Sequence, residues 1–97
     1  MQASGADTWV IRHAAIVNKR GLHARAAAKF VKLAAAYDAV VEVEKADLRV
    51  DGTSIMDLMM LVASQGSQIT ILANGVEAEA AATALCDLVA RKFDETE

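Results

Sequence analysis

The sequence predicts one α+β domain, in which a mainly antiparallel four-stranded sheet carries helices packed on one face. Segments that are rich in β-branched residues, or that alternate between apolar and polar residues, have the pattern of strands. Alanine-rich segments with apolar residues at helical spacing have the pattern of helices. These segments follow one another in the order strand, helix, strand, strand, helix, strand, helix. The 97 residues are enough for one hydrophobic core and too few for two.

The first half of the chain supplies three predicted strands and one helix. Residues 9–17 are rich in β-branched side chains and predict a strand, which ends at a turn over residues 18–21. The alanine-rich residues 24–36 predict the first helix. Valine alternates with glutamate at residues 41–44, which is the pattern of a half-buried strand, and a tight connection leads to a short strand at residues 48–51.

The second half supplies the remaining strand and two helices. Residues 55–62 predict a helix, and the polar, glycine-containing residues 64–67 end it. Residues 68–73 predict the last strand, after which Asn74-Gly75 turns the chain. Residues 76–93 predict the closing helix, because their apolar residues recur at helical spacing.

The helix predicted over residues 55–62 is unusually apolar, with a polar residue at only one of its eight positions. Leu58, Leu61 and Val62 are enough for a stripe that faces the core. The other apolar residues near the helix start would then be exposed and form an adaptable docking surface: Ile55, Met56 and Met59. A helix that is buried on more than one side would explain the same pattern equally well.

Basic residues gather in one segment of an otherwise acidic chain. The net charge is −3, yet residues 18–32 contain five basic residues and no acidic one, whereas residues 33–97 contain twelve acidic and four basic residues. A positive island on an acidic protein favours an anionic small group or an acidic protein partner. Nucleic acid is not expected, because the segment is short and has little aromatic interleaving. Charge alone is also compatible with a solvated helix face.

Several other kinds of site and location are not expected. Residues 1–7 lack the basic start and apolar stretch of a signal peptide, and no apolar run approaches the ~20 residues that span a membrane, so we expect a cytoplasmic protein. The single cysteine, Cys86, cannot form an internal disulfide. His13 and His23 lack the neighbouring ligands of a metal site, and no glycine-rich phosphate or dinucleotide motif predicts a cofactor.

His23 is the strongest candidate for a functional residue, because it stands where the turn gives way to the first helix. A side chain at a helix start lies beside unpaired N–H groups and the positive end of the helix dipole, which favour a bound phosphoryl group. Arg25 adds planar donors that suit phosphate oxygens. A hydrolase would need a positioned general base, which the motif lacks. A merely structural polar residue at the helix start fits the spacing equally well.

Ser54 is the second candidate, at the start of the apolar helix. Asp57 follows it by three residues, as in a capping box, so a structural role as helix cap explains Ser54 without further function. A phosphate on Ser54 would still be tolerated at a helix N-terminus. It would also add negative charge beside a surface where a partner docks.

Two segments of the chain resemble a known family. GLHARAAAKFV at residues 21–31 resembles the active-site segment of HPr, the histidine-containing phosphocarrier family of the bacterial phosphoenolpyruvate-dependent phosphotransferase system. SIMDLM at residues 54–59 resembles its second segment, as do the residues that follow, Gln65-Gly66 and 69–71. The family usually has proline where this chain has Ala26, and alanine costs little there because it is a good helix former. The resemblance covers a domain over residues 9–93, with short tails at residues 1–8 and 94–97.

The resemblance implies an open-faced β-sandwich with the element order βαββαβα and the function of a phosphoryl carrier rather than an enzyme. His23 would accept a phosphoryl group on Nδ1 from enzyme I and pass it to an enzyme IIA-type acceptor, while Arg25 neutralises the phosphate. Ser54 falls on the position that an HPr kinase/phosphorylase modifies in some members. We expect a monomer, whose residues in contact with partners are Ala28, Lys29, Lys32, Ile55, Met56 and Met59.

Two alternatives stay open. Within the carrier class, the sequence does not separate a sugar-transport carrier from a carrier of the nitrogen-related regulatory branch. In a different class, a regulatory domain would bind an anion or a partner without being phosphorylated. A small acid–base enzyme that uses His23 is not expected, because the motif offers no second catalytic group.

Overall fold

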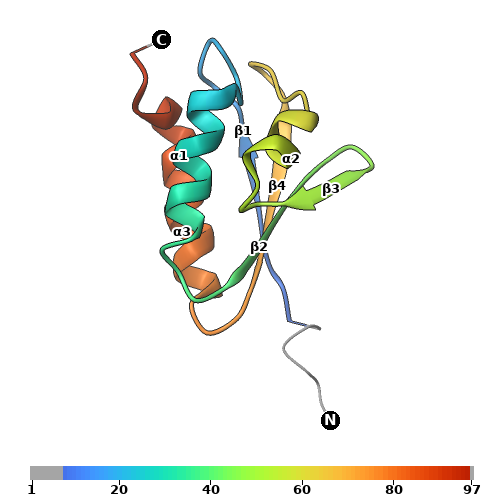
Figure 1. Ribbon diagram of the computed structural model, residues 1–97, viewed down its shortest axis with the longest axis vertical. Helices are drawn as coiled ribbons and strands as arrows, with labels where there is room; N and C mark the ends of the chain where they lie inside the picture. The colour runs from blue at the N-terminus through green and yellow to red at the C-terminus, as the bar shows by residue number, and fades with distance from the viewer. Residues whose placement is uncertain (1–7, 97) are drawn as a thin grey trace.

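A computed structural model describes residues 8–96, in which a four-stranded sheet is covered on one face by helices (Figure 1). In chain order the elements are β1 (Val10–Ala15), α1 (Ala24–Ala34), β2 (Val40–Lys45), β3 (Leu48–Asp51), α2 (Ile55–Met60), β4 (Gln68–Asn74), α3 (Ala78–Ala90) and a single turn (Lys92–Asp94). The strand order is β1-β4-β2-β3, and every neighbouring pair is antiparallel. The predicted fold class and order of elements are therefore confirmed.

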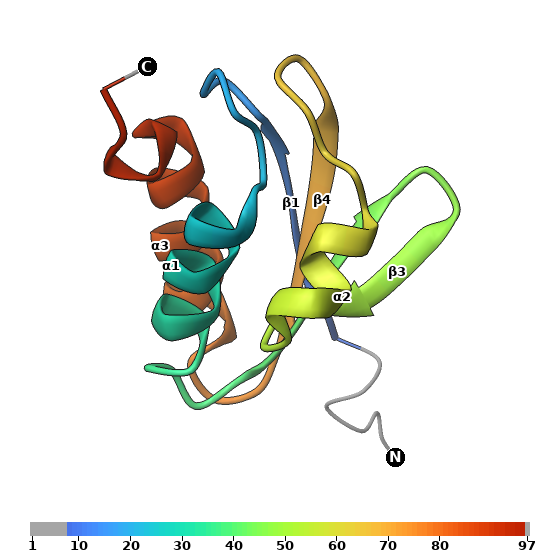
Figure 2. The ribbon, with the colours of Figure 1, turned by 45° about the horizontal axis from the view of Figure 1, so that its top comes forward.

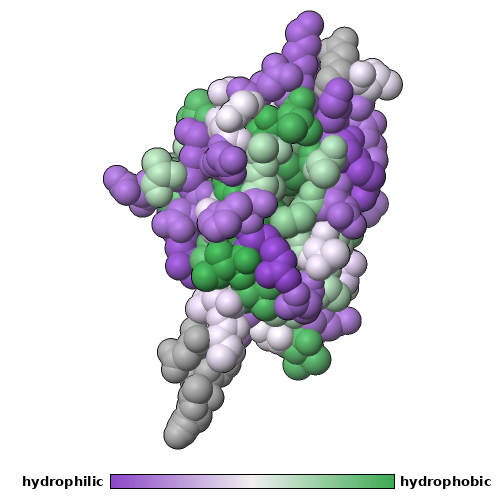
Figure 3. All heavy atoms as spheres, turned by 180° about the vertical axis from the view of Figure 1, so that it is seen from behind, coloured by the Kyte–Doolittle hydropathy of each residue, from purple (hydrophilic) through white to green (hydrophobic). Residues whose placement is uncertain are grey.

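The helices form the second layer. α3 packs on β1 and β4, α1 lies between α3 and α2, and α2 lies beside β3 (Figures 1 and 2). Within residues 8–96 no helix covers the opposite face of the sheet, which presents hydrophilic side chains with hydrophobic ones between them (Figure 3). This arrangement is the open-faced β-sandwich that the resemblance implies.

The core lies between the sheet and the helices. Ile69 and Ile71 of β4 and Val43 of β2 are buried on the face that the helices cover, because side chains alternate between the two faces of a strand. They pack in one cluster with Phe30 of α1 and Leu85 of α3. This core fixes the helices on the sheet. The two candidate residues lie at helix starts, His23 at the start of α1 and Ser54 at the start of α2.

The helix boundaries differ from the predicted ones. α1 ends two residues earlier than expected, and α3 occupies Ala78–Ala90 rather than residues 76–93. The chain turns sharply after α3, and Phe93 is completely buried there in a turn rather than in a helix. Cys86 in α3 is half-buried, and this burial raises the pKa of its thiol.

One prediction about α2 is wrong. Leu58 and Leu61 are buried as expected, but Val62 is 74% exposed. The helix ends at Met60, and Val62 has a φ of 51°, so its side chain leaves the direction of the helical stripe.

Two further expectations concern the ends of the chain and membranes. The tail expected over residues 1–8 lies outside the described residues except for Thr8. None of the helices within residues 8–96 is long and apolar enough to cross a membrane.

Candidate functional site

The turn before α1 is held from two sides. The Asn18 carbonyl accepts a hydrogen bond from Gly21 N (3.2 Å), and the buried Asn18 side chain donates from Nδ2 to the Gly21 carbonyl (2.8 Å). Leu22 N donates to the Ala63 carbonyl in the loop after α2 (2.9 Å). Gly21 has a φ of 69°, and a β-carbon there would lie 2.5 Å from the Ala63 oxygen. Only glycine fits this position, so the turn is fixed against the end of α2.

His23 is the N-cap of α1, at the position that the sequence predicts. Its backbone is extended (φ −79°, ψ −179°), and its carbonyl accepts a hydrogen bond from Ala27 N (2.8 Å). Within the described residues the imidazole makes no capping hydrogen bond, and the first turn contains no acidic residue. The N–H groups at this helix start therefore stay available to an anion bound at the ring.

A carboxylate from the C-terminal segment reaches the same ring. Glu95 Oε2 is hydrogen-bonded to His23 Nε2, and Glu95 Oε1 accepts a hydrogen bond from Asn18 Nδ2 (3.0 Å). Partial burial alone would raise the pKa of Glu95, but the hydrogen bonds from Asn18 and His23 and the nearby charge of Arg20 outweigh it, so its pKa is lowered. Glu95 is therefore an ionised carboxylate at neutral pH.

A basic hollow opens beside this contact. It is lined by three basic residues, Arg20, Arg25 and Lys29, together with Asp94, Glu95 and Thr96. Lys29 is committed elsewhere, because its Nζ donates to the Phe93 carbonyl (2.8 Å). Arg25 is exposed and makes no hydrogen bond or ion pair with any of residues 8–96. Its guanidinium is free to bind phosphate oxygens.

Ser54 caps α2 as predicted. Its hydroxyl accepts a hydrogen bond from Asp57 N (3.2 Å). The turn before it is closed by the Asp51 carboxylate, which accepts hydrogen bonds from Thr53 Oγ1 (2.6 Å) and Thr53 N (2.8 Å). These two donors lower the pKa of Asp51. Ser54 thus has a defined structural role whether or not it is modified.

Exposed apolar residues in and after α2 form a group that we call the α2 surface: Ile55, Met56, Met59, Met60 and Val62. The first three were predicted to be exposed, whereas the last two were not. Val62 and His23 line one small hollow, so the end of α2 lies beside the imidazole. Ser54 lies at the other end of the same helix, about 9 Å away along its axis. His23 and Ser54 therefore flank the α2 surface from opposite ends.

The remaining predicted contact residues lie on α1, and the second histidine, His13, lies on β1. Ala28 and Lys32 are exposed on α1, whereas Lys29 is partly covered by the C-terminal segment. His13 Nδ1 is hydrogen-bonded to Thr70 Oγ1 on the neighbouring strand (3.0 Å), which supports a structural role. Within residues 8–96 no cluster of three or more histidine, cysteine or acidic residues could hold a metal ion.

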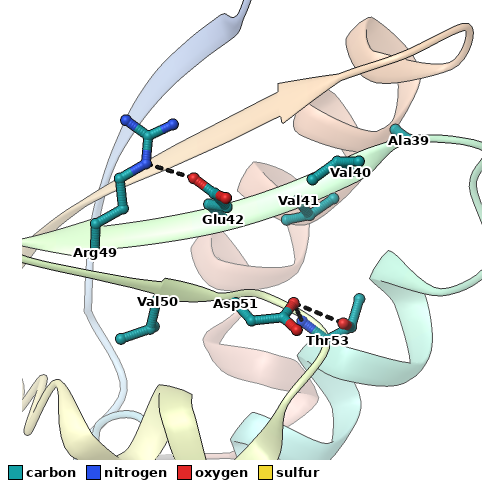
Figure 4. Close-up of a pocket in the computed structure, with 8 residues that line it drawn as sticks. All are labelled: Ala39, Val40, Val41, Glu42, Arg49, Val50, Asp51 and Thr53. Carbon is teal, nitrogen blue, oxygen red and sulfur yellow. Dashed lines mark hydrogen bonds and ion pairs between the residues drawn. The ribbon is translucent and has the colours of Figure 1, made fainter. Parts of the chain in front are cut away.

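A hollow of about 680 Å³ is lined by residues of β2 and β3 and by Thr53 in the turn before Ser54 (Figure 4). Its charged groups pair with one another, since Arg49 Nε donates to the Glu42 carboxylate and Thr53 donates to Asp51 (Figure 4). None of the predicted site residues lines it. The hollow therefore contains none of the residues to which the sequence assigns chemistry.

Comparison with known proteins identifies the family. A family model described as "PTS HPr component phosphorylation site" matches residues 10–91, a range that includes His23, Arg25 and Ser54. The chain belongs to the HPr family. This family comprises phosphocarriers of the phosphotransferase system, and the resemblance of residues 21–31 and 54–59 to its two characteristic segments is confirmed.

Relatives and solved structures of the HPr family agree with this assignment. The phosphocarrier protein HPr of Pseudomonas putida is 47% identical over 87 residues, which cover 89% of this chain and 97% of that protein. The phosphocarrier protein NPr of Shewanella violacea is 43% identical over 88 residues, which cover 91% and 97%. The crystal structure of HPr-C-His from Thermoanaerobacter tengcongensis superposes with a TM-score of 0.86 at 41% identity, covering 91% of this chain and 99% of that one.

Proposed function

We propose that this HPr-family protein is a stoichiometric phosphoryl carrier that acts on His23. The imidazole accepts a phosphoryl group from an enzyme I charged by phosphoenolpyruvate, and passes it to an enzyme IIA-type acceptor. The observation that carries this proposal is the placement of His23 at the start of α1, next to a hollow lined by Arg25, whose guanidinium makes no hydrogen bond or ion pair within residues 8–96.

The site can hold a phosphoryl group without trapping it. The lone pair of Nδ1 forms the bond to phosphorus as the bond to the donor breaks, and the reverse step delivers the group to the acceptor. The N–H groups at the start of α1 and the guanidinium of Arg25 attract the phosphate oxygens. A helix terminus at an exposed site contributes about 0.3–1 kcal/mol, which orients the group and leaves it transferable.

The surfaces around His23 supply the contacts for partners. The α2 surface begins beside the ring. The proposed contacts on α1 are the exposed Ala28 and Lys32 and the partly covered Lys29, of which the two lysines line a hollow against α3. Methionine-rich apolar surfaces adapt to several partners, which suits a carrier that must dock with both a donor and an acceptor. Ser54, at the far end of the α2 surface, is the proposed site of regulation by an HPr kinase/phosphorylase. The protein acts as a monomer in the cytoplasm under this proposal.

The acceptor decides between the sugar-transport branch and the nitrogen-related branch. Relatives named HPr and NPr match at 47% and 43% identity, so both branches are compatible with the chain. We expect the phosphorylated protein, separated from enzyme I, to discharge onto an enzyme IIA of one branch faster than onto that of the other. Following the phosphohistidine by native gel with each acceptor in turn identifies the branch. A phosphorylated protein that discharges onto neither acceptor would contradict the proposed relay.

A further inference from the structure

We propose that Glu95 is a positioning residue, which holds the ring hydrogen of His23 on Nε2 and so leaves the lone pair on Nδ1. The inference rests on the proposed function and deepens it, because it names what selects the nitrogen that accepts the phosphoryl group. It comes from the contact between the side-chain carboxylate of Glu95 and the imidazole of His23.

The contact fixes the tautomer of the His23 imidazole, because an ionised carboxylate can only accept a hydrogen bond. Both oxygens of Glu95 have a donor, Asn18 Nδ2 on Oε1 and His23 Nε2 on Oε2. An ionised carboxylate has no hydrogen to give, so Nε2 must carry the hydrogen of this bond. In the neutral ring the other nitrogen, Nδ1, then holds the lone pair.

The C-terminal segment that carries Glu95 is anchored independently of the ring. Phe93 is completely buried, and its carbonyl accepts a hydrogen bond from Lys29 Nζ (2.8 Å). The three consecutive residues of the turn Lys92–Asp94 have positive φ angles of 61°, 54° and 62°, although none of them is glycine. Such a conformation persists only where the surroundings determine it. Glu95 is thus delivered to His23 by a segment whose path is fixed before it reaches the ring.

Glu95 places a negative charge against the imidazole in a region that is otherwise mostly basic. Arg20, Arg25 and Lys29 bring positive charge to the hollow, and Glu95 is the carboxylate that contacts the imidazole within residues 8–96. The neighbouring acid, Asp94, is paired with Arg91 instead (3.0 Å). As the bond to phosphorus forms, the ring gains positive charge, and a carboxylate at Nε2 stabilises it.

Glu95→Gln tests this role with little change in shape. The amide has one acceptor and one donor end, and Asn18 Nδ2 requires the acceptor. The amide NH₂ then faces His23, where it can only donate to Nε2, so the ring hydrogen moves to Nδ1. The comparable carboxylate-to-amide change in a Ser-His-Asp triad lowers kcat by about 10⁴ through the wrong tautomer. Asp94→Asn is the matched control, since it removes the same charge from the same segment and the same hollow and leaves the contact with the ring unchanged.

Two measurements decide the inference. Two-bond ¹H–¹⁵N correlation spectra at about pH 9, above the usual titration range of histidine, report which nitrogen carries the hydrogen. We expect hydrogen on Nε2 in the wild type and in Asp94→Asn, and a shift of population to the Nδ1–H form in Glu95→Gln. We also expect Glu95→Gln to be phosphorylated by enzyme I at least about tenfold more slowly, and Asp94→Asn within about twofold of the wild type.

The outcomes separate this inference from the proposed function. An unshifted tautomer in Glu95→Gln overturns the inference, and so does phosphorylation that is unchanged or faster, as it would be if Glu95 merely occupied the place of the phosphate. A tautomer shift in a protein whose wild type is never phosphorylated contradicts the proposed function. In that case the spectra still support the placement of the hydrogen by Glu95.

Discussion

Replacing Arg25 with alanine is expected to slow phosphorylation of His23 by about ten- to hundredfold while leaving the fold intact. Hydrogen bonds to a charged group contribute about 1.5–3 kcal/mol, and each 1.4 kcal/mol is about a factor of ten in rate. The Arg25 side chain is exposed and makes no hydrogen bond or ion pair within residues 8–96, so its loss removes nothing from the core. The free energy of unfolding is expected to change by less than about 0.5 kcal/mol.

Two control variants separate the guanidinium from its charge. Arg25→Lys keeps the charge and loses the planar pair of donors, so we expect an intermediate rate. Lys19→Ala removes an exposed charge from the same basic segment, outside the residues that line the hollow, and is expected to slow phosphorylation by less than about threefold. Rapid-quench measurements of phosphohistidine formation give these rates. If Arg25→Ala and Lys19→Ala slow the reaction equally, Arg25 acts through general charge alone and its proposed role is wrong.

The second large effect is expected from Ser54→Asp, which we predict to weaken enzyme I-dependent phosphorylation by about tenfold. Aspartate caps a helix about as well as serine, so α2 is expected to begin at the same residue. The new negative charge lies at the edge of the α2 surface, about 9 Å along the helix from its end beside His23. It therefore acts on docking rather than on the ring. A phosphate carries more charge than aspartate, so modification of Ser54 is expected to have the larger effect.

Ser54→Asn is the matched control, because asparagine has nearly the shape of aspartate, caps equally well and carries no charge. Initial rates at increasing concentrations of the protein, with enzyme I and phosphoenolpyruvate held constant, separate docking from transfer. We expect Ser54→Asp to raise KM with a smaller change in kcat, and Ser54→Asn to resemble the wild type. Equal rates for the two variants would mean that Ser54 is a cap only.

Much of the fold and the two candidate residues could be predicted because their signals are local. The alternation of Val41 and Val43 with glutamates marks a strand with one buried face, and both valines are buried. The turn followed by an alanine-rich run places His23 at a helix start, and the structure has it there. Ser54 with Asp57 three residues later predicts a cap, and the predicted hydrogen bond is present.

The features that could not be predicted depend on contacts between distant segments. α2 ends at Met60 although Leu61, Val62 and Ala63 include no glycine or proline to signal a stop. The end is set instead by packing against the turn before α1, where Leu22 N donates to the Ala63 carbonyl (2.9 Å). Val62 is exposed as a result.

The contact of Glu95 with His23 could not be predicted for the same reason, because it joins distant segments of the chain. It joins residues 72 positions apart, and it depends on a turn in which three non-glycine residues take positive φ angles. No local pattern marks such a turn, because these residues adopt it only when burial of Phe93 and the bond from Lys29 hold it. The sequence therefore places His23 at a helix start, and only the tertiary structure brings Glu95 to its ring.

The central claim, that His23 carries the phosphoryl group, is tested most directly by intact-mass spectrometry. Wild type and His23→Ala are incubated with enzyme I, magnesium and phosphoenolpyruvate, with circular dichroism showing that the variant is folded and an established HPr showing that the enzyme I is active. We expect one acid-labile phosphoryl group on the wild type and none on His23→Ala. An unmodified wild type, or an equal adduct on both proteins, would contradict the claim.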